Sequence, residues 1–156
     1  MIEIDIPGEQ TITIEHVVMD YNGTLAQDGQ LIEGLVTLFY QLAPTVTLHV
    51  VTSDTFGQAA QQLLGLPCQV RVLEGDHADV AKLEYARSLG LENVCAMGNG
   101  RNDRLMIQQA ELGIVVIQRE GAAWDAVEYA DVICTSTADA LALLANPRRL
   151  VATLRG

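Results

Sequence analysis

The feature of this sequence that most constrains its fold is the alternation of short apolar runs with longer segments of helical spacing. The apolar runs are typical of buried strands, and the longer segments repeat apolar residues every three or four positions. We predict strands at 17–19, 46–51, 70–73, 94–97, 114–117 and 132–134, and helices at 32–42, 56–64, 76–89, 103–110, 121–129 and 137–144. This order predicts an α/β fold with a doubly wound, mostly parallel, Rossmann-like sheet and helices on both faces.

The chain begins with a different pattern. Met1–Ile6 and Thr11–Ile14 alternate apolar and polar residues around Pro7 and Gly8, which predicts an N-terminal β-hairpin. The length of 156 residues suits a single domain spanning 1–156, and 49% apolar residues suffice for a core. A basic segment starts at Pro147, after the last predicted helix.

The charge balance excludes several classes of partner. Twenty acidic residues stand against nine basic ones, for a formal charge of −11, so binding to nucleic acid or to an anionic membrane is not expected. No apolar run approaches the ~20 residues needed to span a bilayer. The three cysteines are widely spaced, as is typical of reduced core thiols, and we expect a cytoplasmic protein. Lys82 is the only lysine beside eight arginines.

Polar residues follow three of the predicted strands directly. Asp20 follows the first strand of the sheet, Thr52 ends the second, and Asn99 comes just after the fourth. Ligands of doubly wound sheets bind beyond the carboxyl ends of the strands, so these side chains should share one site. A carboxylate there can ligate Mg²⁺ or attack phosphorus, and Asn99 with Asp103 offers oxygen ligands for a hard cation.

Four segments, in order, carry a resemblance to a known family. They are residues 20–25 (DYNGTL), 50–54 (VVTSD), 82–90 (KLEYARSLG) and 97–103 (MGNGRND). Together they resemble the four motifs of the haloacid dehalogenase-like superfamily of phosphotransferases, over residues 14 to 145. The second segment is most similar to that of P-type ATPases, which points to the small, capless, soluble P-type ATPase-like group.

The resemblance implies roles for individual residues. Asp20 would be the nucleophile that forms an aspartyl-phosphate, Thr52 would hydrogen-bond the transferring phosphoryl group, and Lys82 would neutralise the charge that they share. Phosphoryl transfer needs this combination of positioning and charge neutralisation in any case. Ser53 is an alternative source of the hydroxyl, and Thr52 and Asp54 could instead cap the following helix.

The resemblance also implies a Mg²⁺ cofactor and a phosphate-binding loop. The ion would be held by Asp20, the backbone carbonyl of Asn22, and the side chains of Asn99 and Asp103. The phosphate would bind at Asn22, Gly23, Thr24 and Ser53, where amides and hydroxyls can cradle its oxygens.

Two positions depart from the family pattern. Phosphatases of the superfamily have an acid–base Asp where this chain has Asn22, and an amide cannot exchange a proton at neutral pH. General acid–base catalysis contributes typically ~10²–10⁴-fold, so we expect slow turnover. Asn99 replaces a second Asp, which predicts weaker metal binding, although Asp103 could compensate. Alternatively, the protein is a non-catalytic phosphate- or partner-binding module. Asn22 is also a common turn residue before glycine.

The spacing of the motifs leaves no room for a cap domain. Only 31 residues separate Asp20 from Thr52, and 29 separate Thr52 from Lys82. Because capless relatives often close their sites by association, the resemblance implies a homo-oligomer, to which the N-terminal hairpin could contribute. The expected substrate is a phosphorylated small molecule or ATP.

Overall fold

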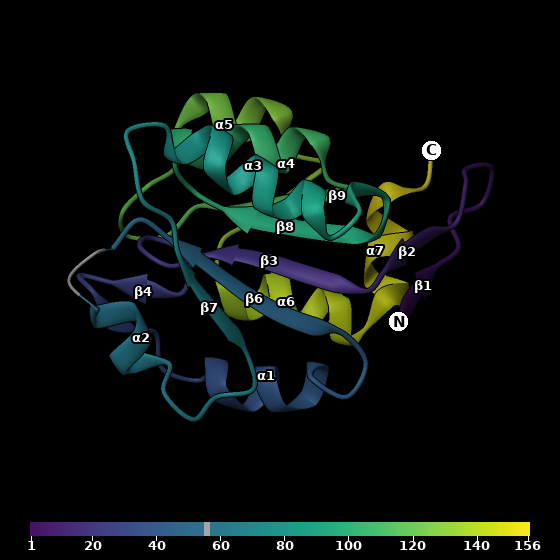
Figure 1. The fold of residues 1–156 in the computed structure, drawn as a ribbon. Coiled ribbons are helices and arrows are strands. Elements are labelled where there is room, and N and C mark those ends of the chain that lie inside the picture. The colour runs from purple at the N-terminus through teal and green to yellow at the C-terminus, as the bar shows by residue number, and fades with distance from the viewer. Residues whose placement is uncertain (55–56) are drawn as a thin grey trace.

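The computed structural model describes residues 1–54 and 57–156, and its centre is a parallel sheet (Figure 1). Six strands pair in the order β10-β9-β8-β3-β6-β7, all parallel, so the predicted doubly wound α/β sheet is confirmed. The strands are β3 (His16–Asp20), β6 (Thr47–Thr52), β7 (Gln69–Val72), β8 (Val94–Gly98), β9 (Leu112–Val116) and β10 (Val132–Cys134).

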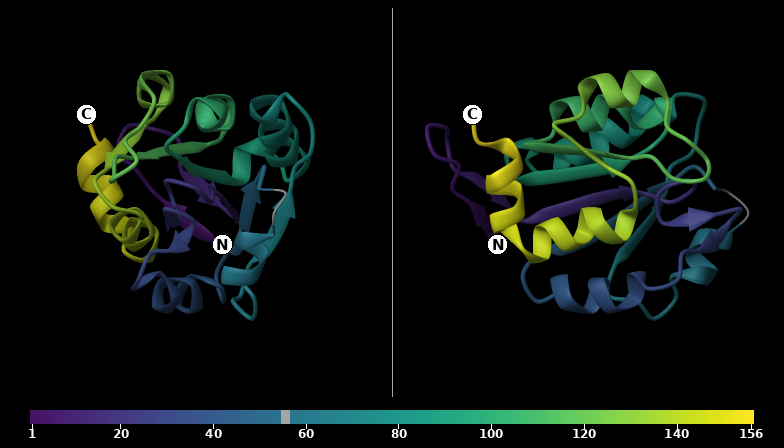
Figure 2. Two further views of the ribbon diagram at one scale, coloured as in Figure 1. Left: turned by 90° about the vertical axis from the view of Figure 1, so that its left-hand side faces the viewer. Right: turned by 180° about the vertical axis from the view of Figure 1, so that it is seen from behind.

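Helices cover both faces of this sheet (Figures 1 and 2). One layer contains α3 (Ala78–Ser88), α4 (Arg104–Gln109) and α5 (Trp124–Tyr129), and the other contains α1 (Leu35–Leu42), α2 (Gln58–Gln62) and α6 (Thr137–Ala145). Two 3₁₀ turns, η1 (Leu91–Asn93) and η2 (Arg101–Asp103), flank β8. The predicted helix start at Phe56 lies outside the described residues. The prediction that a helix begins at Gly121 is wrong, because this glycine has a φ of 71°, which no right-handed helix adopts.

The N-terminal hairpin is confirmed, and it lies at the amino end of the sheet. Strands β1 (Ile2–Ile4) and β2 (Ile12–Ile14) pair antiparallel. The basic C-terminal segment forms helix α7 (Pro147–Leu154), which packs against β1 and α6. Proline suits the first turn of this helix, where its missing N–H would have no helical acceptor. Both termini therefore lie at the end of the sheet opposite the tips of β3 and β8 (Figure 1).

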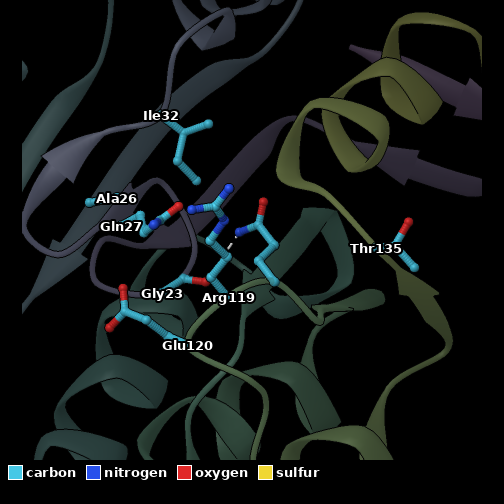
Figure 3. Close-up of a pocket in the computed structure, with 8 residues that line it drawn as sticks. Gly23, Ala26, Gln27, Ile32, Arg119, Glu120 and Thr135 are labelled. Carbon is cyan, nitrogen blue, oxygen red and sulfur yellow. Dashed lines mark hydrogen bonds between the residues drawn. The ribbon is translucent and has the colours of Figure 1, made fainter.

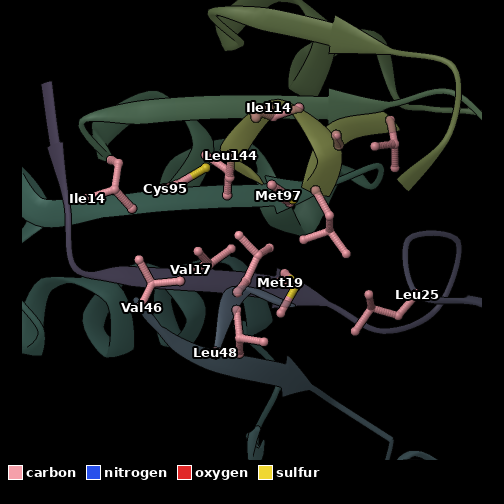
Figure 4. Packing of buried hydrophobic residues seen from close by; sticks show 14 of the residues in the cluster. Ile14, Val17, Met19, Leu25, Val46, Leu48, Cys95, Met97, Ile114 and Leu144 are labelled. Atoms are coloured by element: carbon pink, nitrogen blue, oxygen red, sulfur yellow. The ribbon is translucent and has the colours of Figure 1, made fainter. Parts of the chain in front are cut away.

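The core consists of two apolar layers separated by the sheet. Val17 and Met19 pack into the layer under α1 and α6, whereas Val18 packs into the layer under α3, α4 and α5. Figure 4 shows the first of these layers, with Leu48 and Met97 beside Met19. Because successive side chains of a strand point to opposite faces, residue 20 shares the face of Val18, toward α3.

A small flap stands beyond the carboxyl ends of the strands. It is the antiparallel pair β4 (Ala26–Gln27) and β5 (Gln30–Leu31), joined by a tight turn. The buried Tyr21 donates its hydroxyl hydrogen to the carbonyl of Gly29 at 2.9 Å. The backbone N–H of Leu31 donates to Gln62 Oε1 of α2 at 3.2 Å. The flap is thereby fixed to both the strand-end loop and the helix layer below. In the described part of the chain, no helix is long and apolar enough to cross a membrane.

Candidate active site

Three strands end level with one another and bring the predicted site residues together. In the sheet register Asp20 lies opposite Val51 of β6, and Met19 lies opposite Met97 of β8. The residues that follow, Thr52 and Asn99, therefore reach the same edge as Asp20. Asp20 is buried, with 7% of its surface exposed.

Lys82 reaches this edge from α3, and its ammonium group binds two carboxylates. Its Nζ lies 2.7 Å from Asp20 Oδ1 and 2.7 Å from Asp103 Oδ1, and 3.2 Å from Asn102 Oδ1. The lysine is 1% exposed and Asp103 is fully buried. A lysine is buried this deeply only when its charge is paired, and here all three of its donor positions have acceptors.

The three charges set each other's pKa values. Burial and the neighbouring Asp103 carboxylate raise the pKa of Asp20 to about 7, against the opposing effect of Lys82. Burial disfavours the ammonium form of Lys82, but the two carboxylates outweigh this effect and hold its pKa above the usual value. The site thus contains two carboxyl groups for one ammonium group. This excess of negative charge favours the binding of a further cation beside Asp20.

Asp103 connects the lysine to the loop after β8. Its Oδ2 accepts hydrogen bonds from the backbone N–H groups of Asn99, at 3.1 Å, and Gly100, at 2.8 Å. A Cβ on Gly98 would lie 2.4 Å from the Asp103 Cγ atom, so only glycine allows this close approach. Both oxygens of Asp103 are therefore in use, one by Lys82 and the other by two amides.

The loop after Asp20 is a tight turn that packs against Asn99. The Tyr21 carbonyl accepts from the amides of residues 24, 25 and 26, and the loop passes through Gly23 at a φ of 80°. A Cβ on Gly23 would lie 2.2 Å from Asn99 Nδ2. The hydroxyl of the buried Thr24 donates to Asn99 Oδ1 at 3.4 Å. Asn22, at the tip of the loop, is exposed to solvent.

The loop after β6 supplies a hydroxyl to the same edge. Thr52 is buried, and its Oγ1 accepts from the amide of Asp54 at 3.1 Å, which leaves the hydroxyl hydrogen to be donated elsewhere. Ser53 is exposed. The Asp54 carboxylate accepts from the amide of Ala59 in α2 at 3.0 Å, as the capping alternative requires.

Comparison with known proteins adds a relative and a fold. No family model matches the sequence. The uncharacterized protein MJ0073 of Methanocaldococcus jannaschii is 42% identical over 80 residues, which are 49% of this chain and 86% of that protein. The chain belongs to the same family as this archaeal protein.

Several solved structures have the same fold as this chain. The 3-deoxy-D-manno-octulosonate 8-phosphate phosphatase of Moraxella catarrhalis, solved with magnesium, phosphate and a KDO molecule, has a TM-score of 0.65 and 20% identity, covering 91% of this chain and 94% of that one. The cobalt-bound phosphatase YrbI of Haemophilus influenzae has a TM-score of 0.68 and 11% identity over 90% of both chains. The haloacid dehalogenase-like protein SP0104 of Streptococcus pneumoniae has a TM-score of 0.61 and 12% identity, covering 83% of this chain and 97% of that one. The fold is therefore the haloacid dehalogenase-like fold that the four motifs predicted.

Two residues that contact the site, Asn102 and Gln118, were not predicted from the sequence. Asn102 is the third acceptor of Lys82, and it lies within the fourth motif. Gln118 donates to the carbonyls of Gly23, at 3.2 Å, and Thr24, at 3.0 Å. Gln118 lies just beyond β9, so the rule that identified the other strand-end residues could have found it. Arg101, another residue of the fourth motif, pairs with Asp125 at 3.1 Å.

Proposed function

We propose that this chain is a phosphohydrolase that works through an aspartyl-phosphate on Asp20. The observation that carries the proposal is the buried ammonium group of Lys82 between Asp20 and Asp103, at the point where β3, β6 and β8 end. A buried cation beside a carboxylate at the strand ends suits transfer of a phosphoryl group, in which positioning and neutralisation of charge carry most of the catalysis.

The first step would use the Asp20 oxygen that Lys82 does not bind, Oδ2. That oxygen would attack phosphorus while the bond from phosphorus to the leaving oxygen breaks, and the leaving group departs with the electron pair. Lys82 holds Asp20 in place, and the Thr52 hydroxyl donates to a phosphoryl oxygen. The turn at Gly23 and Thr24 lies at the same edge, but its two amides already donate to the carbonyls of Ala26 and Tyr21, so the turn would have to open for them to bind the remaining oxygens. Water then attacks the phosphorus of the aspartyl-phosphate and releases inorganic phosphate and the Asp20 carboxylate.

The residues at this edge fit a Mg²⁺ ion by their donor chemistry. In the described part of the chain no three His, Cys, Asp or Glu side chains form a metal cluster, so an ion would rely on neutral oxygens as well. We propose that the Asp20 carboxylate, the Asn22 carbonyl and the Asn99 amide oxygen hold it, all being oxygen ligands that suit Mg²⁺. Bound there, the ion would supply the positive charge that a phosphate dianion needs in addition to Lys82.

The predicted fourth ligand, Asp103, has a different place in this proposal. Because Lys82 and two backbone amides occupy its oxygens, Asp103 would have to release one of these partners to reach an ion. We therefore propose that Asp103 positions Lys82 and the loop after β8. ATP stays a second predicted substrate that depends on the likeness of residues 50–54 to P-type ATPases. The likeness to 8-phosphate phosphatases of the same fold instead supports a phosphomonoester as the substrate.

Asn22 defines the expected substrate preference. It cannot protonate an alkoxide leaving group, and it cannot take a proton from the attacking water. Aryl and acyl phosphates, which leave as stable anions, should therefore react faster than alkyl phosphates, and the phosphoenzyme should persist.

The test is incubation with acetyl phosphate and Mg²⁺, followed by intact-mass and peptide mapping. We expect one phosphoryl group on Asp20, no adduct in Asp20→Asn, and a normal adduct in the control Asp5→Asn, an exposed carboxylate on the hairpin. No adduct together with no turnover of 4-nitrophenyl phosphate would overturn the proposal. Restoring acids with Asn22→Asp and Asn99→Asp separates the alternatives, since faster hydrolysis indicates a slow enzyme and unchanged inactivity a binding module.

A further inference from the structure

A pocket of about 400 Å³ lies next to the phosphate-binding turn, between the flap and the loop after β9 (Figure 3). Gly23, Ala26 and Gln27 form one side of it, and Arg119, Glu120 and Thr135 form the other. Asp20, Thr52 and Lys82 do not line the pocket, and Gly23, three residues after Asp20, connects it to the site, so a leaving group that extends past Gly23 would enter this space. The volume falls within the range of small-molecule sites.

The loop that carries Arg119 is fixed on both sides of this residue. Gln118 donates to two carbonyls of the phosphate-binding turn, and its Oε1 accepts from the amide of Thr137 at 3.0 Å. Glu120 accepts from the amide of Asp28, in the turn of the flap, at 3.4 Å. Arg119 therefore lies between Gln118, which is hydrogen-bonded to the loop after Asp20, and Glu120, which is hydrogen-bonded to the flap. Figure 3 shows its guanidinium group extending toward Ile32 across the pocket that both residues line.

Arg119 differs in its charge pairing from Arg101 and Arg104, the two arginines that follow β8. Arg101 pairs with Asp125, and Arg104 pairs with Asp79 at 2.9 Å. Among residues 1–54 and 57–156, Arg119 forms no ion pair. Arg119 is exposed, and it shares the lack of an ion pair in the described residues with Arg71, Arg148, Arg149 and Arg155, but of these five it is the one that lines the pocket beside Gly23.

A second hollow near the site lacks this property. It is lined by residues of α3 and of the loop after β8, including Asp79, Arg101 and Arg104. Its two arginines are already neutralised by carboxylates, so an incoming anion would gain little there. Both spaces are lined by carboxylates, Glu120 in the first and Asp79 in the second, but among the described residues only the arginine of the first forms no ion pair, which favours that pocket for an anionic part of a substrate.

We propose that Arg119 selects substrates whose leaving group bears a second anionic group, a carboxylate or another phosphate. This inference rests on the proposed function, and it adds the substrate class. The planar fork of a guanidinium group donates two parallel hydrogen bonds to such an oxyanion, which a neutral amide cannot accept with the same strength. Gln118 and Glu120 hold the loop in position, and Arg119 contacts the substrate.

The test compares substrates that differ only in the distal group. Aryl phosphates are used because they need no general acid: 4-carboxyphenyl phosphate, 1,4-phenylene bisphosphate, and the neutral 4-carbamoylphenyl phosphate, each with its meta isomer. We expect kcat/KM for at least one anionic member to exceed that of its neutral partner by roughly 10-fold or more, as charge-assisted hydrogen bonds allow. The member preferred distinguishes a carboxylate from a second phosphate.

Variants then assign the preference to its residue. Arg119→Gln should reduce the ratio of anionic to neutral kcat/KM to within about 3-fold, and Arg119→Lys should retain part of it, because charge remains without the fork. The matched control is Arg148→Gln, which removes an exposed arginine on α7 and should leave both the ratio and the rates unchanged.

The failures of the two proposals are distinguishable. If the wild type hydrolyses 4-nitrophenyl phosphate but shows no preference, or keeps its preference in Arg119→Gln, the role of Arg119 is wrong and the phosphohydrolase stands. If the wild type hydrolyses none of these esters, the proposed function fails, and calorimetric binding of the same pairs decides on Arg119. Equal affinities of wild type and Arg119→Gln for the anionic member would overturn the role.

Discussion

Replacing Lys82 with methionine removes the one cation that binds both buried carboxylates. Methionine fills a similar volume, so the change deletes charge with little loss of packing. Two hydrogen bonds of 2.7 Å are lost, and Asp20 and Asp103 then face each other without a counter-ion. Breaking a buried ion pair from one side costs about 3–5 kcal/mol, and we expect the free energy of unfolding to fall by that amount. Part of this loss is recovered where Asp20 takes up a proton.

The matched control lies one and a half turns along the same helix. Arg87 also pairs with a carboxylate, Glu84, but both side chains are about half exposed. Exposed pairs contribute about 0–1 kcal/mol, so Arg87→Met should change stability little. Urea denaturation of the two variants measures the contrast directly, and the phosphorylation assay measures function. We expect Lys82→Met to form the Asp20 adduct at least ~10³-fold more slowly, while Arg87→Met forms it normally.

A double variant separates charge from packing. In Lys82→Met with Asp20→Asn, one of the two uncompensated carboxylates is gone, and Asp103 still accepts from two backbone amides. This double variant should be more stable than Lys82→Met alone by about 1–3 kcal/mol. Phosphorylation of Lys82→Met at the wild-type rate would refute the catalytic reasoning. Equal stability of Lys82→Met and Arg87→Met would refute the electrostatic reasoning.

Three further predictions concern separate parts of the molecule. Asn22→Asp should raise the rate of hydrolysis of alkyl phosphates by about 10²–10⁴-fold, with a smaller gain for 4-nitrophenyl phosphate, as measured by phosphate release; equal gains would contradict a missing general acid. Gly23→Ala should lower the free energy of unfolding more than Gly8→Ala. Both glycines have positive φ, so alanine costs about 1–2 kcal/mol at either position, but only a Cβ at Gly23 meets Asn99. Thermal unfolding of the two variants tests this. Burial and nearby positive charge lower the pKa of His49 to about 4 in the folded state, below its unfolded value of 6.5, so its contribution to stability is complete above pH 6.5 and is lost as the pH falls toward 4. We expect a loss of about 2–3 kcal/mol across this range, and a smaller slope in His49→Gln; parallel slopes would show that His49 does not cause the loss.

The architecture was predictable because the signals for it are local. Short apolar runs alternate with helical segments along the whole chain, and three strands of the sheet end at Asp20, Thr52 and Gly98. The level ends of β3, β6 and β8 follow from the parallel pairing, so Asp20, Thr52 and Asn99 could be placed at one edge without a structure. The convergence of Lys82 on Asp20 came from the resemblance, since nothing in the local sequence of α3 distinguishes a buried lysine from an exposed one.

Contacts between side chains distant in sequence were beyond the sequence reasoning. The motif named Asp103, but it could not reveal that both carboxylate oxygens have partners in the fold. Gln118 makes its contacts across more than ninety residues, and only the fold brings it to Gly23. Helix α7 was predicted only as a basic segment, because its arginines dominate the sequence and only a few apolar residues pack it against β1.

The position of the chain ends has a practical consequence. Both termini lie beside the hairpin and α7, across the length of the sheet from Asp20 and the flap (Figure 1). A tag, a fluorescent protein or a surface linker attached at either end would therefore project away from the mouth of the site. Immobilised or fused forms of the protein should give the same kinetics as the free chain, which makes single-turnover measurements on a solid support feasible.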